Sequence, residues 1–136
     1  MRRRFSTWLM VAATVASVPA AAADFDGTVP LICALVDLQA CVPGERCRRE
    51  QAADINLPNI LRVDVAAKTI AGEPPDGGGL RQTPIGSVNT NNQGLVLQGV
   101  DGDRSWNAVI DPQGELSIAA IGPDAGFVIF GNCVVR

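Results

Sequence analysis

Apolar and polar residues alternate with a period of two over much of the chain. In residues 61–65 the apolar positions are interleaved with Arg62 and Asp64, and similar alternation recurs further along the chain. Such alternation is typical of half-buried β-strands, and no segment beyond residue 59 has the 3.6-residue apolar period of a helix. The pattern predicts strands at 28–36, 61–65, 95–98, 106–110, 116–120 and 127–130. The last of these is apolar on both faces and is therefore expected to be covered on both sides.

Turn-forming residues divide the second half of the chain into strand-plus-turn units of about ten residues. Residues 101–103 and 111–114 are rich in Gly, Asp and Pro, which suit turns because Gly tolerates positive φ and Pro presets φ. This spacing predicts an all-β fold, a small antiparallel meander of about eight strands that closes into a barrel or forms a sandwich. Residues 51–59 are expected to form a loop, with one helical turn near 48–53 as an alternative.

The N-terminal segment carries the three regions of a signal peptide. Met1–Arg4 is basic, residues 8–16 are apolar, and small alanines precede Asp24, where we expect cleavage. The apolar run from Phe5 to Val18 is shorter than the ~18–20 residues that cross a bilayer. The sequence therefore predicts a cleaved signal peptide rather than a membrane anchor.

We accordingly expect a signal peptide over residues 1–23 and a single small β domain over residues 24–136. The protein is expected to be periplasmic or secreted, with no membrane association after cleavage. Residues 2–5 partly resemble a twin-arginine export signal, so the general secretory and twin-arginine routes both stay open.

An even number of cysteines in an exported chain indicates a disulfide framework. The Pro43-Gly44 turn can bring Cys41 and Cys47 together, which leaves Cys33 to pair with Cys133. The second bond would join the first and last predicted strands where the barrel closes. A four-cysteine zinc site would need two close pairs with C-x2–4-C spacing, and the gaps here are wider.

The composition narrows the possible chemistry. The chain has no histidine, which excludes Ser-His-Asp and Cys-His catalysis and any histidine-bearing metal site. Without residues 1–23 it has 8 basic and 14 acidic residues, a net charge of −6 that disfavours nucleic acid and anionic membranes as partners. We expect no cofactor, no metal and no catalytic residues.

One basic cluster is a candidate contact for a partner. Arg46, Arg48 and Arg49 flank Cys47, and the guanidinium fork suits carboxylates. The competing interpretation is a solvated loop, because acidic residues flank the cluster on both sides.

Three further features have an ordinary structural explanation. Residues 101–107 begin like a calcium-binding EF-hand loop but lack its later Gly and Glu, so a β-turn explains them better. Asp111 and Glu115 could form a carboxylate pair, but they flank a predicted hairpin turn. Trp106 is expected to be a core residue, with a ligand platform as the alternative, and its indole N–H needs an acceptor if it is buried.

Seven parts of the chain form a distinctive pattern: residues 31–33, 41–47, 55–58, 61–64, 95–99, Trp106 and residues 126–133. Together they resemble a family of small exported bacterial proteins whose activity is uncharacterised. The resemblance implies a single disulfide-bonded domain and no particular activity.

Four functions remain open at this point, of which an enzyme that uses carboxylates alone ranks last. The leading hypothesis is a non-catalytic binding or structural protein whose partner is another protein or a small ligand. An acidic, disulfide-bonded module could instead inhibit an exported or host enzyme, as lysozyme inhibitors do. A third possibility is a lipocalin-like carrier that encloses a small apolar ligand within a barrel.

Overall fold

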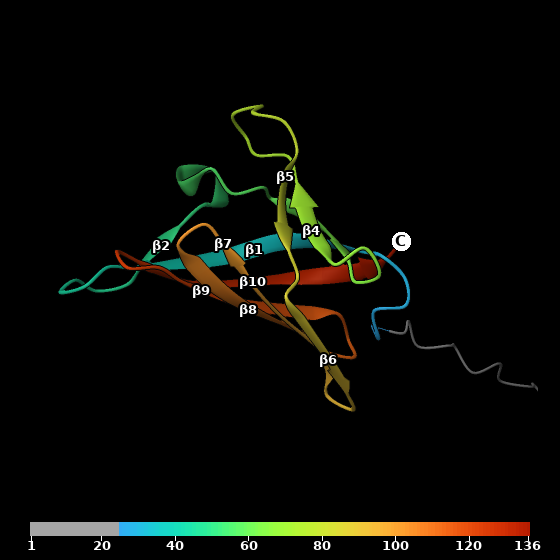
Figure 1. Ribbon diagram of the computed structural model, residues 1–136. Coiled ribbons are helices and arrows are strands. Elements are labelled where there is room, and N and C mark those ends of the chain that lie inside the picture. The colour runs from blue at the N-terminus through green and yellow to red at the C-terminus, as the bar shows by residue number, and fades with distance from the viewer. Residues whose placement is uncertain (1–24) are drawn as a thin grey trace, which may run out of the picture.

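The computed structural model describes residues 25–136, which form one ten-stranded antiparallel sheet (Figure 1). The predicted signal peptide, residues 1–23, lies outside the described residues. A short 3-10 helix, η1 (Ala52–Ile55), separates the second strand from the third. The strands are β1 (Leu31–Cys41), β2 (Arg48–Glu50), β3 (Ile60–Asp64), β4 (Thr69–Gly72), β5 (Arg81–Pro84), β6 (Ser87–Asn91), β7 (Gly94–Asp101), β8 (Arg104–Ile110), β9 (Glu115–Ile121) and β10 (Gly126–Val135).

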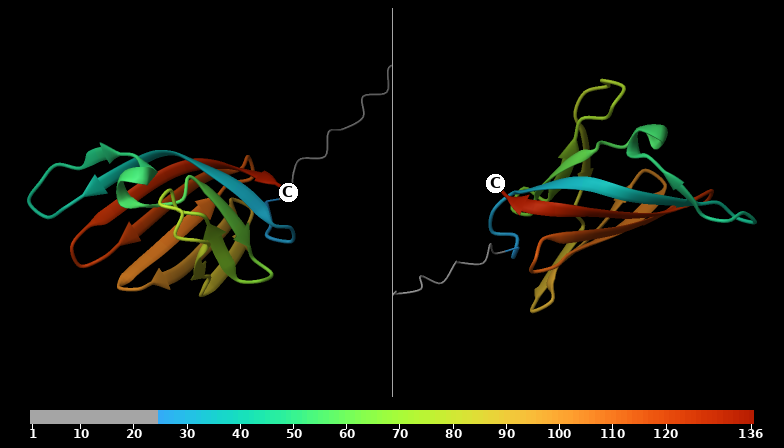
Figure 2. Two further views of the ribbon diagram at one scale, coloured as in Figure 1. Left: turned by 90° about the horizontal axis from the view of Figure 1, so that it is seen from above. Right: turned by 180° about the vertical axis from the view of Figure 1, so that it is seen from behind.

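The strand order is β5-β4-β3-β1-β10-β9-β8-β7-β6, with β2 paired to β1 beside this path. Most neighbours in the sheet are also neighbours in sequence, which confirms the predicted antiparallel meander. The first and last long strands, β1 and β10, pair with each other as expected. The sheet curls into a half-barrel (Figure 2).

Both predicted disulfides are present. Cys33 lies directly opposite Cys133 in the β1–β10 pairing, and the bond joins two buried sulfurs. Cys41 and Cys47 close the hairpin between β1 and β2. Among the described residues no cysteine is free.

Alternating residues of each strand face the inside of the half-barrel. On β10, Phe127 and Ile129 point inward and are buried, while Val128 and Phe130 point outward and are 39% and 44% exposed. The expectation that residues 127–130 are covered on both sides is therefore wrong. Their outward positions are apolar in sequence, but no other described element packs over that part of the outer face.

One end of the half-barrel is packed solid. Leu31, Leu95, Leu97 and Ile110 have no exposed surface there, and Phe25, which precedes β1, packs against the same cluster. A smaller cluster of Leu38, Phe127 and Ile129 lies apart from it, with the segment around η1 packed against it. The inner surface between the packed end and this second cluster lines the cavity described below.

Strands β5 and β6 follow one another with only Ile85 and Gly86 between them, and the chain bends there from one edge of the sheet to the other (Figure 1). The N–H of Ile85 donates to the carbonyl of Lys68 beside β4 (2.9 Å). The N–H of Gly86 donates to the carbonyl of Gln98 on β7 (2.7 Å). The two edges of the curled sheet are thus tied at this bend.

Four strands lay outside the prediction: β2, β4, β5 and β6. The sheet has ten strands instead of about eight because these short segments gain their strand conformation from pairing with neighbours. All of β6 is exposed, so it carries no buried face that could produce an apolar alternation. Within residues 25–136, no helix has the length and apolar character needed to span a bilayer.

Candidate functional site

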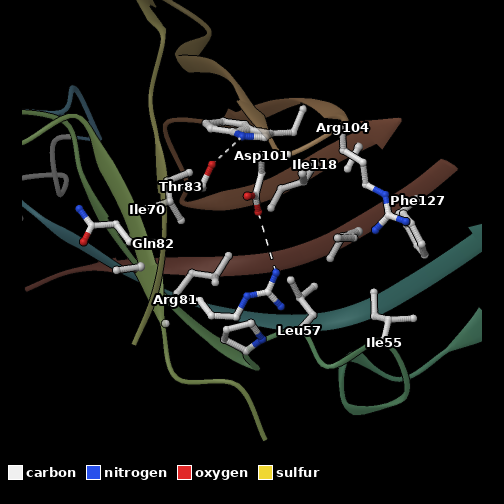
Figure 3. A pocket seen from close by; sticks show the side chains of 18 of the residues that line it. Ile55, Leu57, Ile70, Arg81, Gln82, Thr83, Asp101, Arg104, Ile118 and Phe127 are labelled. Atoms are coloured by element: carbon white, nitrogen blue, oxygen red, sulfur yellow. Dashed lines mark hydrogen bonds and ion pairs between the residues drawn. The ribbon is translucent and has the colours of Figure 1, made fainter. Parts of the chain in front are cut away.

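A cavity of about 650 Å³ lies on the inner face of the curled sheet (Figure 3). Its walls come from strands β3, β4, β5, β8, β9 and β10, so it collects residues that are up to 74 positions apart in the sequence. Apolar side chains dominate the lining: Ile55, Leu57, Pro58, Leu61, Ile70, Trp106, Ile118, Ala120, Phe127 and Ile129.

The period-two pattern explains why strand residues line the cavity. Ile118 and Ala120 are on the inward face of β9, where the exposed Ala119 between them points outward. Across the β9–β10 pairing, Ala120 lies opposite Phe127 and Ile118 lies opposite Ile129. The pairing of two inward faces therefore builds a continuous apolar wall.

The segment around η1 forms another wall of the cavity. Its turn is fixed locally, because the Asp54 carboxylate accepts a hydrogen bond from the N–H of Gln51 (2.9 Å) and Asn56 adopts a left-handed conformation with φ 52°. The Asn56 side-chain amide also donates to Asp76 (2.7 Å). These bonds place Ile55 and Leu57, on either side of Asn56, against the cavity.

Two polar contacts reach from β5 to other strands of the cavity wall, one to β8 and one to β7. The indole Nε1 of Trp106 on β8 donates to Oγ1 of Thr83 on β5 (3.2 Å). Farther toward the mouth, Nη2 of Arg81 lies 4.0 Å from Oδ2 of Asp101 at the end of β7 (Figure 3). Both side chains of this ion pair are about half exposed, so we expect it to contribute little to stability.

Glycine is required where Trp106 approaches β7. Gly99 lies opposite Trp106 in the β7–β8 pairing, and a Cβ at Gly99 would overlap the indole ring and the carbonyl oxygen of Pro84. The indole ring of Trp106 therefore lies over Gly99, which has no side chain. This close approach brings β5 and Trp106 together at the edge of the cavity.

The mouth of the cavity carries charges of both signs. Arg81, Asp101, Asp103 and Arg104 line it. The Arg104 guanidinium lies over the Phe127 ring, with Cζ 5.2 Å from the ring centroid, and its Nη2 is 3.5 Å from Asp124. The cavity thus combines an apolar interior with a polar mouth, the usual arrangement in small-molecule sites.

Trp106 is a core residue, as predicted, and its role as a ligand platform stays a prediction. It is 9% exposed and belongs to the main buried cluster, and its ring also lines the cavity. Its indole N–H has the acceptor that burial requires, since Thr83 accepts the hydrogen bond.

Two of the three arginines in the basic cluster of Arg46, Arg48 and Arg49 have acidic partners within the hairpin. Arg49 makes two 2.9 Å hydrogen bonds to both carboxylate oxygens of Asp37, and Arg48 lies 3.8 Å from Glu50. The three arginines remain exposed on the β1–β2 hairpin, away from the cavity lining. Their contact with a partner stays a prediction.

The Asp37–Arg49 pair has an electrostatic consequence. Hydrogen bonds from Arg49 hold the pKa of Asp37 below its ordinary value of 3.8, and Asp37 in turn raises the pKa of Arg49. Asp26 also has a lowered pKa, because the Thr28 hydroxyl and N–H donate to its carboxylate. Neither carboxylate lines the cavity.

The remaining acidic candidates have structural partners. Asp111 Oδ1 accepts hydrogen bonds from the N–H groups of Gln113 (2.9 Å) and Glu115 (2.8 Å), which stabilises the β8–β9 turn. Residues 101–103 turn between β7 and β8, with Gly102 at φ 62°. Within the described part of the chain, no three acidic or cysteine side chains group closely enough to hold a metal ion.

Sequence reasoning missed most of the polar mouth. Arg81 and Thr83 follow a Gly-rich segment with no alternation, and nothing in their sequence context indicates that they face Trp106. From the sequence, Arg104 is predicted only to lie at a β-turn. The signal that could have pointed to the site was the buried indole, which needs an acceptor from another strand.

No protein-family model matches this chain, and neither a search of curated proteins nor a search of solved structures found a similar protein.

Proposed function

We propose that this protein is a non-catalytic binding protein of an exported compartment, which holds a small, mainly apolar molecule inside its half-barrel. The observation that carries this proposal is the cavity of about 650 Å³, which falls in the ~300–1,000 Å³ range of small-molecule sites. Burying an apolar ligand against its walls is favourable, because apolar surface leaves water on both partners.

The contrast between the two ends of the half-barrel supports the proposal. At the packed end, side chains such as Leu95 and Ile110 fill the interior completely. At the other end, Ile118 and Ala120 are only partly buried and face open space. A ligand in that space would complete the burial of apolar side chains that the chain itself leaves half covered.

The exported location is supported by the cysteines. Two disulfides form readily and persist in an oxidising compartment such as the periplasm or the extracellular medium. The non-catalytic role is supported by the composition, because a chain without histidine lacks the commonest general acid–base side chain.

A matched pair of variants tests the cavity. Ala120→Trp would place an indole into the cavity, whereas Ala119→Trp would place the same side chain on the outer face of the same strand. The probe is N-phenyl-1-naphthylamine, a neutral apolar dye whose emission rises in apolar surroundings. We expect the unaltered protein and Ala119→Trp to bind the dye, and Ala120→Trp to lose at least about tenfold in affinity.

Native mass spectrometry of protein isolated from its own host adds a second measurement. A retained small molecule that disappears in Ala120→Trp, but not in Ala119→Trp, supports the proposal. Equal dye binding by the two variants would contradict it, because the dye would then be bound outside the cavity.

A further inference from the structure

Arg104 stands at the cavity mouth with an unused hydrogen-bond donor. Its Nε is buried and has no partner among the described residues. The backbone of Gly122 covers Nε from one side. If residue 122 carried a Cβ, that atom would lie 3.0 Å from Nε. The Arg104 side chain as a whole is still 39% exposed, so a ligand at the mouth can reach it, and an acceptor gained there is stabilising.

We infer that the ligand is an amphipathic monocarboxylate whose apolar chain lies in the cavity and whose carboxylate binds Arg104. This inference rests on the proposed function and specifies the ligand that the cavity takes. A guanidinium edge presents two parallel N–H donors, which match the two oxygens of a carboxylate.

The position of Arg104 suits this role. The guanidinium lies over the Phe127 ring in a cation–π contact, with Cζ 5.2 Å from the ring centroid (Figure 3). Phe127 is itself part of the apolar wall. A carboxylate on Arg104 therefore lies next to the start of the apolar surface that would hold the alkyl chain.

The acidic residues at the mouth leave this site available. Asp124 lies 3.5 Å from Nη2 of Arg104, and its side chain is 71% exposed. The ion pair between the two residues is therefore long, and water screens it. Asp101 faces Arg81 at 4.0 Å, which balances its charge. Asp103 is exposed at the turn, where solvent weakens its repulsion of a bound anion.

The test compares two ligands that differ only in the head group. Dodecanoate and dodecan-1-ol would each be titrated against the full chain by displacement of N-phenyl-1-naphthylamine. We expect dodecanoate to bind about tenfold more tightly, because only it offers two acceptor oxygens with a negative charge. Added salt should reduce this preference.

Variants assign the preference to one side chain. Arg104→Met keeps an unbranched stem on Phe127 and should lower dodecanoate affinity to the level of dodecanol, with dodecanol unchanged. Arg104→Lys keeps the positive charge but lacks the two parallel N–H donors of the guanidinium. It should therefore retain only part of the preference for dodecanoate. Arg62→Met, on the exposed part of β3 outside the cavity lining, should leave both affinities unchanged.

Each result separates this inference from the proposed function. If dodecanol binds as tightly as dodecanoate, or if Arg104→Lys retains the full preference, the inference is wrong while the apolar site stands. If the dye does not bind and neither alkyl ligand displaces it, both the inference and the proposed function are wrong.

Discussion

The indole Nε1 of Trp106 donates a 3.2 Å hydrogen bond to Oγ1 of Thr83, joining β8 to β5 across the open side of the half-barrel. These two strands are not neighbours in the sheet, since β4, β3, β1, β10 and β9 lie between them in the strand order. The bond therefore holds the edge strand β5 to β8, at the boundary between the packed core and the cavity.

Removal of this acceptor should loosen the open side. Thr83→Val keeps the shape of the side chain but leaves the partly buried indole N–H without a partner, so we expect a loss of about 1–2 kcal/mol in the free energy of unfolding. Urea denaturation followed by circular dichroism measures it. Thr69→Val on the adjacent strand β4 is the control, because no hydrogen bond of its hydroxyl occurs among the described residues. Equal losses in the two variants would contradict a specific role for the Thr83 hydroxyl.

Adding a methyl group at Gly99 should displace Trp106. The Cβ of Gly99→Ala would overlap the indole ring and the Pro84 carbonyl oxygen, so we expect a destabilisation of roughly 1–3 kcal/mol, typical of overpacking. Gly86→Ala is the matched control, since its Cβ would meet the Gln98 carbonyl oxygen at an ordinary 3.5 Å. Thermal unfolding of both variants checks the prediction, and a milder effect at Gly99 than at Gly86 would overturn it.

The two disulfides should differ in their contribution to stability. The Cys33–Cys133 bond spans 100 positions and the Cys41–Cys47 bond spans 6. In the chain-entropy model, closing the long loop contributes about 4.7 kcal/mol and the short loop about 2 kcal/mol. Denaturation of the two double alanine variants should therefore show the larger loss for Cys33→Ala with Cys133→Ala. The reverse order would show that loop length does not decide the effect.

The Asp37–Arg49 pair should make a pH-dependent contribution to stability. Because the folded-state pKa of Asp37 lies below 3.8, the pair stabilises the fold fully above that pH, and the stabilisation is lost as pH falls through the lowered pKa. Asp37→Asn should therefore lower the Tm near neutral pH and have less effect in strong acid. High salt should reduce the difference at neutral pH, because both groups are exposed. A difference that grows on acidification would contradict this assignment.

Export should be visible at the N-terminus. If residues 1–23 are a signal peptide, protein collected from the periplasm or medium should begin at Asp24 or within two residues of it. N-terminal sequencing decides this. Recovery of a membrane-bound product that begins at Met1 would show that the segment is retained.

Local sequence was enough to predict much of the sheet. Strands such as β8 and β9 bury one face, and a period-two alternation follows directly from the opposite directions of successive side chains. The cysteine pairing could also be predicted. The Pro43-Gly44 turn favours a Cys41–Cys47 bond, and the other two cysteines must then pair with each other. The structure confirms both bonds.

The sequence could not predict where the barrel stays open. Pairing of β1 with β10 joins the two halves of the meander as expected, but the sheet stays open at its edge strands, β5 and β6. Strands β5 and β6 are short and largely exposed, so no apolar pattern marks them. Their position depends on backbone hydrogen bonds from Ile85 and Gly86 to two different neighbours.

The sequence by itself determined the strands with a buried face, the turns between them and the two disulfides, because each depends on residues close in the chain or on a simple count. The tertiary structure alone decided the cavity and its mouth. Phe127 is apolar in any fold, but it becomes a cavity wall only because β10 pairs with β9 and the sheet curls away from β5. Arg104 likewise lies over Phe127 only because β8 and β10 both pair with β9, a neighbourhood that no local pattern encodes.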